Sequence, residues 1–200
     1  MHNRIIFKEL LKHLARPQIT IITGLRRVGK STALKYLLSQ IEHSNKTYID
    51  LEKIENRVLF SENAYATIEA ALKSLGINFN KPCIIALDEI QLVPSSVSVI
   101  KYLYDTYGIK FLLTGSSSFY LKNHFSESLA GRKRIFEMYP LTFQEFLVFK
   151  QLPELEVLAL TETAFNSFIY LKYKHYYEDF IQFGGFPEVV LAETNEDKIV

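Results

Sequence analysis

The stretch GLRRVGKS at residues 24–31 decides the fold. It matches G-x-x-x-x-G-K-[ST] at every fixed position, and its glycines let successive backbone N–H groups point inward at phosphate oxygens. The β-branched run QITIIT at 18–23 precedes it and predicts a buried strand. Leucines at helical spacing predict a helix over 30–41. A strand, a glycine loop and a helix in this order predict a phosphate-binding loop.

Within this loop, Lys30 is expected to place its charge on the outer phosphates, and the Ser31 hydroxyl to bind Mg²⁺. The positive end of the following helix adds to the attraction. Arg26 and Arg27 either add charge near the nucleotide or reach a partner, or they are solvated or paired with acidic neighbours. The predicted nucleotide-binding residues are Gly24, Leu25, Arg26, Arg27, Val28, Gly29, Lys30, Ser31 and Thr32.

Strand and helix patterns alternate on both sides of the loop. A short amphipathic helix is predicted over 3–15, and further helices over 62–75 and 97–106. This alternation indicates an α/β fold with a mostly parallel sheet sandwiched by helices. After Pro140 only helices are expected, so we expect a core at 1–150 and a helical C-terminal extension at 151–200. The remaining predicted strands are 46–51, 83–87, 110–114 and 133–138.

An apolar run followed by two acids, CIIALDE at 83–89, is the second chemical motif. At the carboxyl end of a parallel strand, Asp88 would hold Mg²⁺ and Glu89 would act as general base on a water. The alternative is that Asp88 caps the next helix and Glu89 is exposed. The interval between Lys30 and Asp88 holds one further strand and helix. The two motif strands are therefore predicted not to be neighbours, as in the additional-strand class of P-loop ATPases.

Two later segments carry weaker signals. The strand at 110–114 leads into GSSS, so Thr114 and Ser116 could touch the γ-phosphate or the water, or the serines could form a helix-capping turn. The cluster GRKR at 131–134 holds Arg132, which either acts as an arginine finger in a neighbouring copy or pairs locally. As a nucleic-acid patch this cluster is too short.

Composition excludes several classes of protein. The chain has 200 residues, 48% hydrophobic and 22% charged, which excludes disordered and collagen-like chains. The net charge of +1 gives no global reason to expect nucleic acid as a partner. Cys83 is the single cysteine, so no internal disulfide is possible. Without a signal-peptide core or an apolar run of membrane length, we expect a cytoplasmic protein with no membrane partner.

Five motifs in order resemble a bacterial and archaeal AAA-type P-loop ATPase family related to the STAND class. They are GLRRVGKST at 24–32, ALDEIQ at 86–91, LLTGSSS at 112–118, LAGR with YPLTFQEF at 129–146, and GGFPEVV at 184–190. The resemblance implies that ATP is the nucleotide and that Gln91 belongs to the acidic motif. It also implies that Pro187 contacts the base. Members usually continue into a winged helix and a nuclease-like C-terminal domain.

The expected function is Mg²⁺-dependent ATP binding and hydrolysis, with Glu89, Lys30, Thr114, Ser116 and Arg132 as catalytic candidates. The alternatives are an ATP/ADP-dependent STAND-like switch with little turnover, and the ATPase part of a DNA-handling protein. A homo-oligomer is required if Arg132 acts in trans.

Overall fold

A computed structural model describes residues 2–61, 65–115, 129–153, 157, 166–194 and 196–198. The chain forms two compact units, one of Lys8–Met138 and one of Met1–Phe7 with Tyr139–Val200. The chain thus passes between the units twice, once after Phe7 within α1 and once between Met138 and Tyr139. The functional boundary expected at residue 150 remains a prediction.

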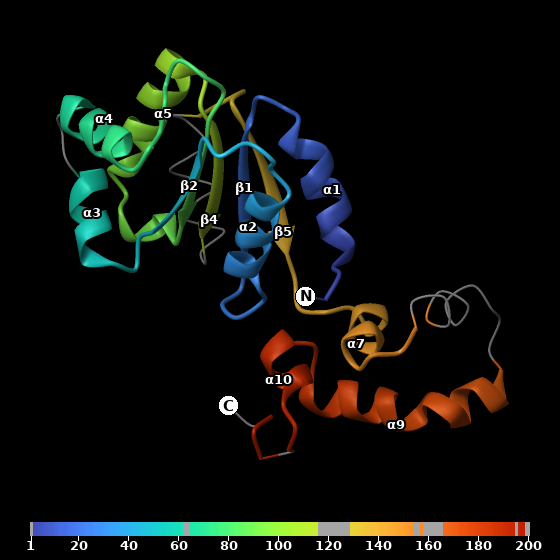
Figure 1. Ribbon diagram of the computed structural model, residues 1–200. Helices are drawn as coiled ribbons and strands as arrows, with labels where there is room; N and C mark the ends of the chain where they lie inside the picture. Colours follow the sequence, from blue (N-terminus) through green and yellow to red (C-terminus); the bar gives the residue numbers. More distant parts are fainter. Residues whose placement is uncertain are drawn as a thin grey trace. The chain divides into compact units, whose positions relative to one another are not determined.

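A five-stranded parallel sheet forms the centre of the Lys8–Met138 unit (Figure 1). The strand order is β2-β3-β4-β1-β5, so β4 lies between the strand of the glycine loop and the strand of the acidic motif. This confirms the predicted α/β fold with an additional strand. The bounds are β1 Ile19–Gly24, β2 Lys46–Asp50, β3 Ile84–Asp88, β4 Lys110–Gly115 and β5 Lys133–Met138.

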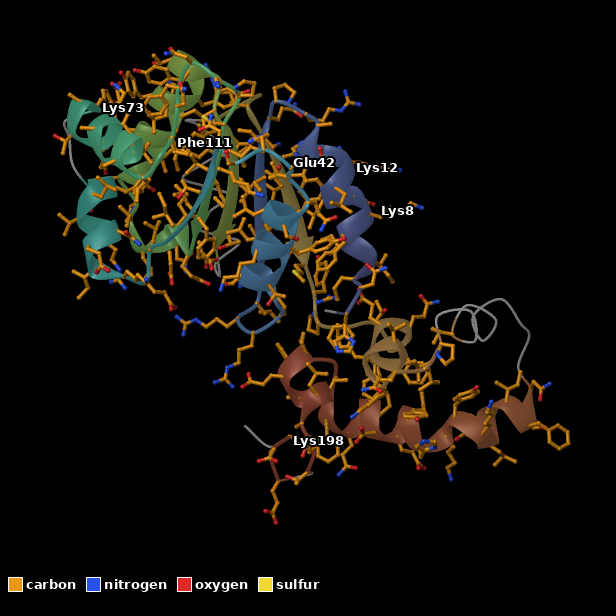
Figure 2. The ribbon with its side chains drawn as sticks, viewed as in Figure 1. Lys8, Lys12, Glu42, Lys73, Phe111 and Lys198 are labelled. Atoms are coloured by element: carbon orange, nitrogen blue, oxygen red, sulfur yellow. The ribbon has the colours of Figure 1, made fainter. Side chains whose placement is uncertain are left out.

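The central strands are apolar because both faces of the sheet are covered. All six residues of β1 and all six of β4 are buried. Ile21 and Phe111 lie on the face that packs against α3, α4 and α5, which gather on one side of the sheet (Figure 1; Phe111 is labelled in Figure 2). These continuous buried runs fix the strand ends, and the strand ends carry the site.

Helices of the same unit agree with the predicted pattern except at two short elements. The segment α3 and the 3-10 turn η1 were not predicted, and residues 62–64 of the predicted 62–75 helix lie outside the described residues. The bounds are α1 Ile5–Leu14, α2 Lys30–Ser39, α3 Ile54–Ser61, α4 Tyr65–Ser74, η1 Ile90–Leu92 and α5 Ser96–Tyr107.

The regular elements described after Tyr139 are all helices, α7 Phe143–Phe149, α9 Ser167–Phe183 and α10 Pro187–Leu191. Thr142 and Glu145 form a reciprocal capping box at the start of α7. Glu145 also accepts a 2.9 Å hydrogen bond from Nε of Arg4, and both side chains are only 6% exposed. This buried ion pair ties the N-terminal residues to α7. No helix in the described part of the chain is both long and apolar enough to cross a membrane.

Candidate nucleotide site

The glycine loop connects β1 to α2, as predicted. Gly24 has φ 146°, and a Cβ there would meet the carbonyl oxygen of Met138 on the neighbouring strand β5. Gly29 has φ 96° and precedes the first residue of α2. Both positions therefore need glycine, the first for a close backbone approach and the second for its conformation. The first backbone N–H groups of an α-helix have no acceptor within the helix, so the start of α2 offers donors next to the loop.

Lys30 lies inside this loop and is 4% exposed. Its Nζ donates hydrogen bonds to the backbone oxygens of Gly24 at 3.2 Å and Leu25 at 2.7 Å. Burial lowers the pKa of Lys30, while the negative charges of Glu89 and Asp88 oppose that shift. The structure thus brings the lysine of the first motif and the acids of the second into one electrostatic site.

The other loop residues differ in exposure. Val28 is buried and Ser31 is half-buried, whereas Leu25 and Thr32 are exposed. Arg26 is exposed, and its charge lowers the pKa of Lys30. Arg26 therefore contributes positive potential at the loop, which favours the first of the two readings given for it. The side chain of Arg27 is exposed, and its backbone has φ 63°.

Asp88 is the last residue of β3 and is 3% exposed. Both of its carboxylate oxygens accept hydrogen bonds. Thr114 of β4 donates to Oδ1, and the hydroxyl of Tyr48 on β2 donates to Oδ2 at 2.6 Å. Burial and this bond to the carboxylate raise the pKa of Tyr48. Two neighbouring strands therefore orient the Asp88 carboxylate.

Glu89 follows β3 in the left-handed region, with φ 58° and ψ 47°. Its backbone N–H donates to Thr114 Oγ1 at 3.0 Å, and its carboxylate accepts a hydrogen bond from Gln91. The Thr114 hydroxyl thus joins Glu89 to Asp88. A non-glycine residue in this conformation stores strain that its surroundings must hold, which is common at functional sites.

The remaining candidates are placed differently. Ser116 lies outside the described residues. Arg132 Nε donates to Asp105 at 2.7 Å, the local pairing that was its alternative reading. Arg132 precedes β5, whereas the glycine loop follows β1. Because the two strands are parallel, Arg132 lies at their amino-terminal ends and the loop at their carboxyl-terminal ends. Pro187 is the first residue of α10 in the second unit, and its contact with a base remains a prediction.

The Ser31 hydroxyl and the Asp88 carboxylate fit a magnesium ion by chemistry, because Mg²⁺ prefers oxygen ligands and keeps several waters. Asp88 is oriented by two donors, which leaves its remaining lone pairs for such waters. Tyr48 is the site residue that the sequence analysis missed. Tyr48 could have been found only from the pairing of β2 with β3, which sets Tyr48 opposite Ala86, two residues before Asp88.

Comparisons with known proteins find relatives that match nearly the whole chain. An uncharacterized protein of Methanocaldococcus jannaschii is 30% identical over 197 residues, which cover 98% of this chain and 41% of that protein. An uncharacterized protein of Haemophilus influenzae is 28% identical and matches over 93% of this chain and 44% of that protein. The chain therefore spans about two fifths of the length of these relatives.

Solved structures show the same fold at low identity. C. elegans PCH-2 has a TM-score of 0.54 at 11% identity, covering 86% of this chain and 52% of that one. The ORC2 protein of Aeropyrum pernix, in its ADP form, has a TM-score of 0.51 at 14% identity, covering 75% and 52%. A family model described as an AAA domain matches residues 16–147, which include the glycine loop, the acidic motif and all five strands. The chain therefore belongs to the AAA domain family and is a nucleotide-binding domain with its P-loop at residues 24–31.

Proposed function

We propose that this domain binds ATP and hydrolyses it with Mg²⁺. The observation that carries the proposal is the placement of Lys30, which is buried in the loop, donates to the backbone oxygens of Gly24 and Leu25 as its hydrogen-bond partners among the described residues, and feels the charges of Glu89 and Asp88. A lysine ammonium that bonds to its own loop carbonyls can exchange these for phosphate oxygens at little cost, because each is a charge-assisted hydrogen bond. The ADP form of the structurally similar ORC2 protein supports an adenine nucleotide.

Each residue would have a separate role in the reaction. The backbone of residues 25–32 and Lys30 bind the phosphates, and Ser31 with Asp88 holds Mg²⁺. The ion would neutralise charge on the phosphate oxygens. Glu89 takes a proton from the attacking water as the water oxygen bonds to the γ-phosphorus and the bond to ADP breaks. Thr114 positions both acids through its hydroxyl.

The test is ATP turnover and ATP binding by wild type, Lys30→Ala and Glu89→Gln. We expect Lys30→Ala to lose binding, and Glu89→Gln to keep binding and lose about 10²-fold or more in turnover, the usual size of a general-base contribution. Glu55→Gln is the matched control, because Glu55 is exposed in the first turn of α3 and undergoes the same chemical change. ATP binding and turnover that survive Lys30→Ala would refute the proposal.

A second candidate function is a nucleotide-dependent switch with little turnover. The hydrogen bond from Gln91 to the Glu89 carboxylate favours it, because this bond holds the carboxylate in place and occupies part of its capacity to accept a proton donor. Release of Glu89 would then be the controlled step. In this case Gln91→Ala raises the turnover rate, whereas an unchanged or reduced rate assigns Gln91 to orienting a working base.

A homo-oligomer with Arg132 in trans is a further part of the proposal. Asp105 would have to release Arg132 for this role, and their pair is more than a third exposed on both sides and therefore weak. Turnover per protomer that rises with protein concentration, and that Arg132→Ala abolishes, is the expected result for a shared site.

A further inference from the structure

A separate cleft lies near the amino-terminal ends of β1 and β5, away from the glycine loop. It is a cleft of about 220 Å³ lined by Glu9, Lys12, His13, Arg16 and Arg134. The lining residues come from α1, from the turn after it and from β5, all within the Lys8–Met138 unit. The sequence shows Arg134 only as part of a short basic run, and folding adds the cations of α1 to it.

The walls of this cleft are held by packed groups. His13 is buried, its Nδ1 lies 2.8 Å from Thr20 Oγ1 of β1, and its ring meets the Phe136 ring edge-on at 5.2 Å. The guanidinium of Arg134 lies 5.1 Å above the same Phe136 ring. His13 and Arg134 are thus both packed against Phe136, so the positions of two lining side chains are set by the core.

In the described part of the chain, the cations of the cleft have no anionic partner. Lys12, Arg16 and Arg134 are exposed, and within the described ranges none of their side chains makes an ion pair or a hydrogen bond. Glu9 is the single acid in the lining. Behind His13, the ammonium of Lys110 is buried and donates to the backbone oxygens of His13 and Gln18. Burial lowers the pKa of His13, and the neighbouring cations, Lys110 first, lower it further.

The positive charge also extends beyond the cleft. Lys8 and Lys12 are four residues apart on α1, a step of about 6 Å, and Arg16 follows in the turn after that helix. Figure 2 shows Lys8 and Lys12 projecting outward from α1. A row of this length exceeds one phosphate group and suits a chain of them. The chain's net charge of only +1 means that this basic row is a local concentration of charge.

We propose that this cleft and the basic row beside it bind the phosphodiester backbone of a nucleic acid, without reading its sequence. The site is separate from the nucleotide site. Arg134 is in register with Thr20, four residues before Gly24 on β1, which separates the two sites by roughly 13 Å along the sheet. The inference therefore does not depend on ATP hydrolysis, and both ligands can be bound at once.

The test is fluorescence anisotropy of a labelled mixed-sequence DNA of about 20 nucleotides, single-stranded and duplex, without ATP and between 50 and 200 mM salt. Four phosphate contacts, one from each cation of the cleft and the row, predict a slope of about −3 to −4 in log K against log salt. Arg16→Gln with Arg134→Gln should weaken binding at least about tenfold at low salt and reduce the slope by about 2. Lys53→Gln with Lys101→Gln removes the same charge from exposed positions elsewhere and should change affinity less than about twofold.

Lys12→Gln with Arg16→Gln is a second test pair, because these side chains are exposed and their loss leaves the Phe136 contacts intact. Lys30→Ala should bind the DNA as wild type does, which excludes the P-loop as the DNA site. The His13 imidazole, observed by NMR, should show a raised pKa when DNA is bound, because phosphate charge stabilises the imidazolium.

Three results would overturn the proposal. One is equal loss of affinity in the test and control pairs. Another is binding of polyglutamate as tight as that of DNA through the same residues, which would assign the cleft to acidic protein segments. The third is saturable binding of inorganic phosphate in the cleft without binding of DNA, which would make it a small-anion site.

Discussion

The burial of Lys110 lowers the free energy of unfolding by an amount that depends on pH and can be measured. It is the first residue of β4, 8% exposed, and burial lowers its pKa to about 8 from an ordinary 10.5. Between these two values the unfolded chain binds a proton at Lys110 that the folded chain does not hold. The free energy of unfolding therefore rises with pH through this window, and the cost is fully present below pH 8.

The size of this effect follows from the shift. A difference of about 2.5 between the two pKa values corresponds to about 3.4 kcal/mol, of which about 2 kcal/mol falls between pH 7.5 and 10. Lys110→Met removes the titration and keeps the side chain's length. Its backbone acceptors, the His13 and Gln18 oxygens, lose their donor at every pH. The difference in unfolding free energy between wild type and Lys110→Met should therefore shift in favour of wild type by about 2 kcal/mol over this range.

Urea unfolding followed by far-UV circular dichroism is the suitable assay, because the chain has no tryptophan and tyrosine fluorescence changes on ionisation near pH 10. Lys101→Met on the exposed face of α5 is the matched control and should give a difference that does not vary with pH. A difference for Lys110→Met that is constant to within about 0.5 kcal/mol from pH 7.5 to 10 would refute the reasoning.

Four further changes test other contacts. Gly24→Ala should abolish nucleotide binding and lower the melting temperature, because the new Cβ would meet the carbonyl oxygen of Met138 in β5. Gly108→Ala is the control, because space is open around that position, and it should lower the free energy of unfolding by only about 1 kcal/mol in a denaturation curve. Tyr48→Phe should lower turnover more than ATP affinity, because it removes one hydrogen-bond donor from the Asp88 carboxylate. Steady-state kinetics that show an equal loss of turnover and of ATP affinity would instead assign Tyr48 to packing alone. Arg132→Ala should change the unfolding free energy by less than about 1 kcal/mol because its ion pair is exposed. Arg4→Met should destabilise the second unit by about 3–5 kcal/mol through the buried carboxylate that it leaves unpaired, and calorimetry that finds no change would contradict this.

The parallel sheet could be predicted because its three central strands, β1, β3 and β4, carry largely apolar runs and alternate with helical patterns along the chain. The position of β4 between β1 and β3 followed from the strand and helix that separate Lys30 from Asp88. Segment α3 was missed because its apolar side chains do not form one buried stripe. Ile54 is 72% exposed and Val58 56%, and only Phe60 is buried. Helix α10 is five residues long and follows a glycine pair, so its local signal is that of a turn.

The motif residues of the site were predictable, but their connections were not. Spacing placed Asp88 at a strand end, whereas the partners of its two oxygens depend on how β2 and β4 align with β3. Register is a tertiary property, so neither the Tyr48 contact nor the Thr114 link between the two acids is visible along the chain. The basic cleft escaped prediction for the same reason, since α1 and Arg134 meet only after folding.

The place of β1 between β4 and β5 also sets the order in which the site can form. Both ladders of β1 pair it with strands about 90 residues or more further along the chain, Lys110–Gly115 and Lys133–Met138. No local hairpin can hold the glycine loop in shape, because parallel neighbours require long connections. During synthesis the loop would leave the ribosome well before β4 and β5, and it would lack its native conformation until both strands had paired with β1. A chain that stopped before β5 would expose β1 as a sheet edge and would lack the Met138 carbonyl oxygen beside Gly24, so we expect the loop to reach its final shape only after the last strand has been made.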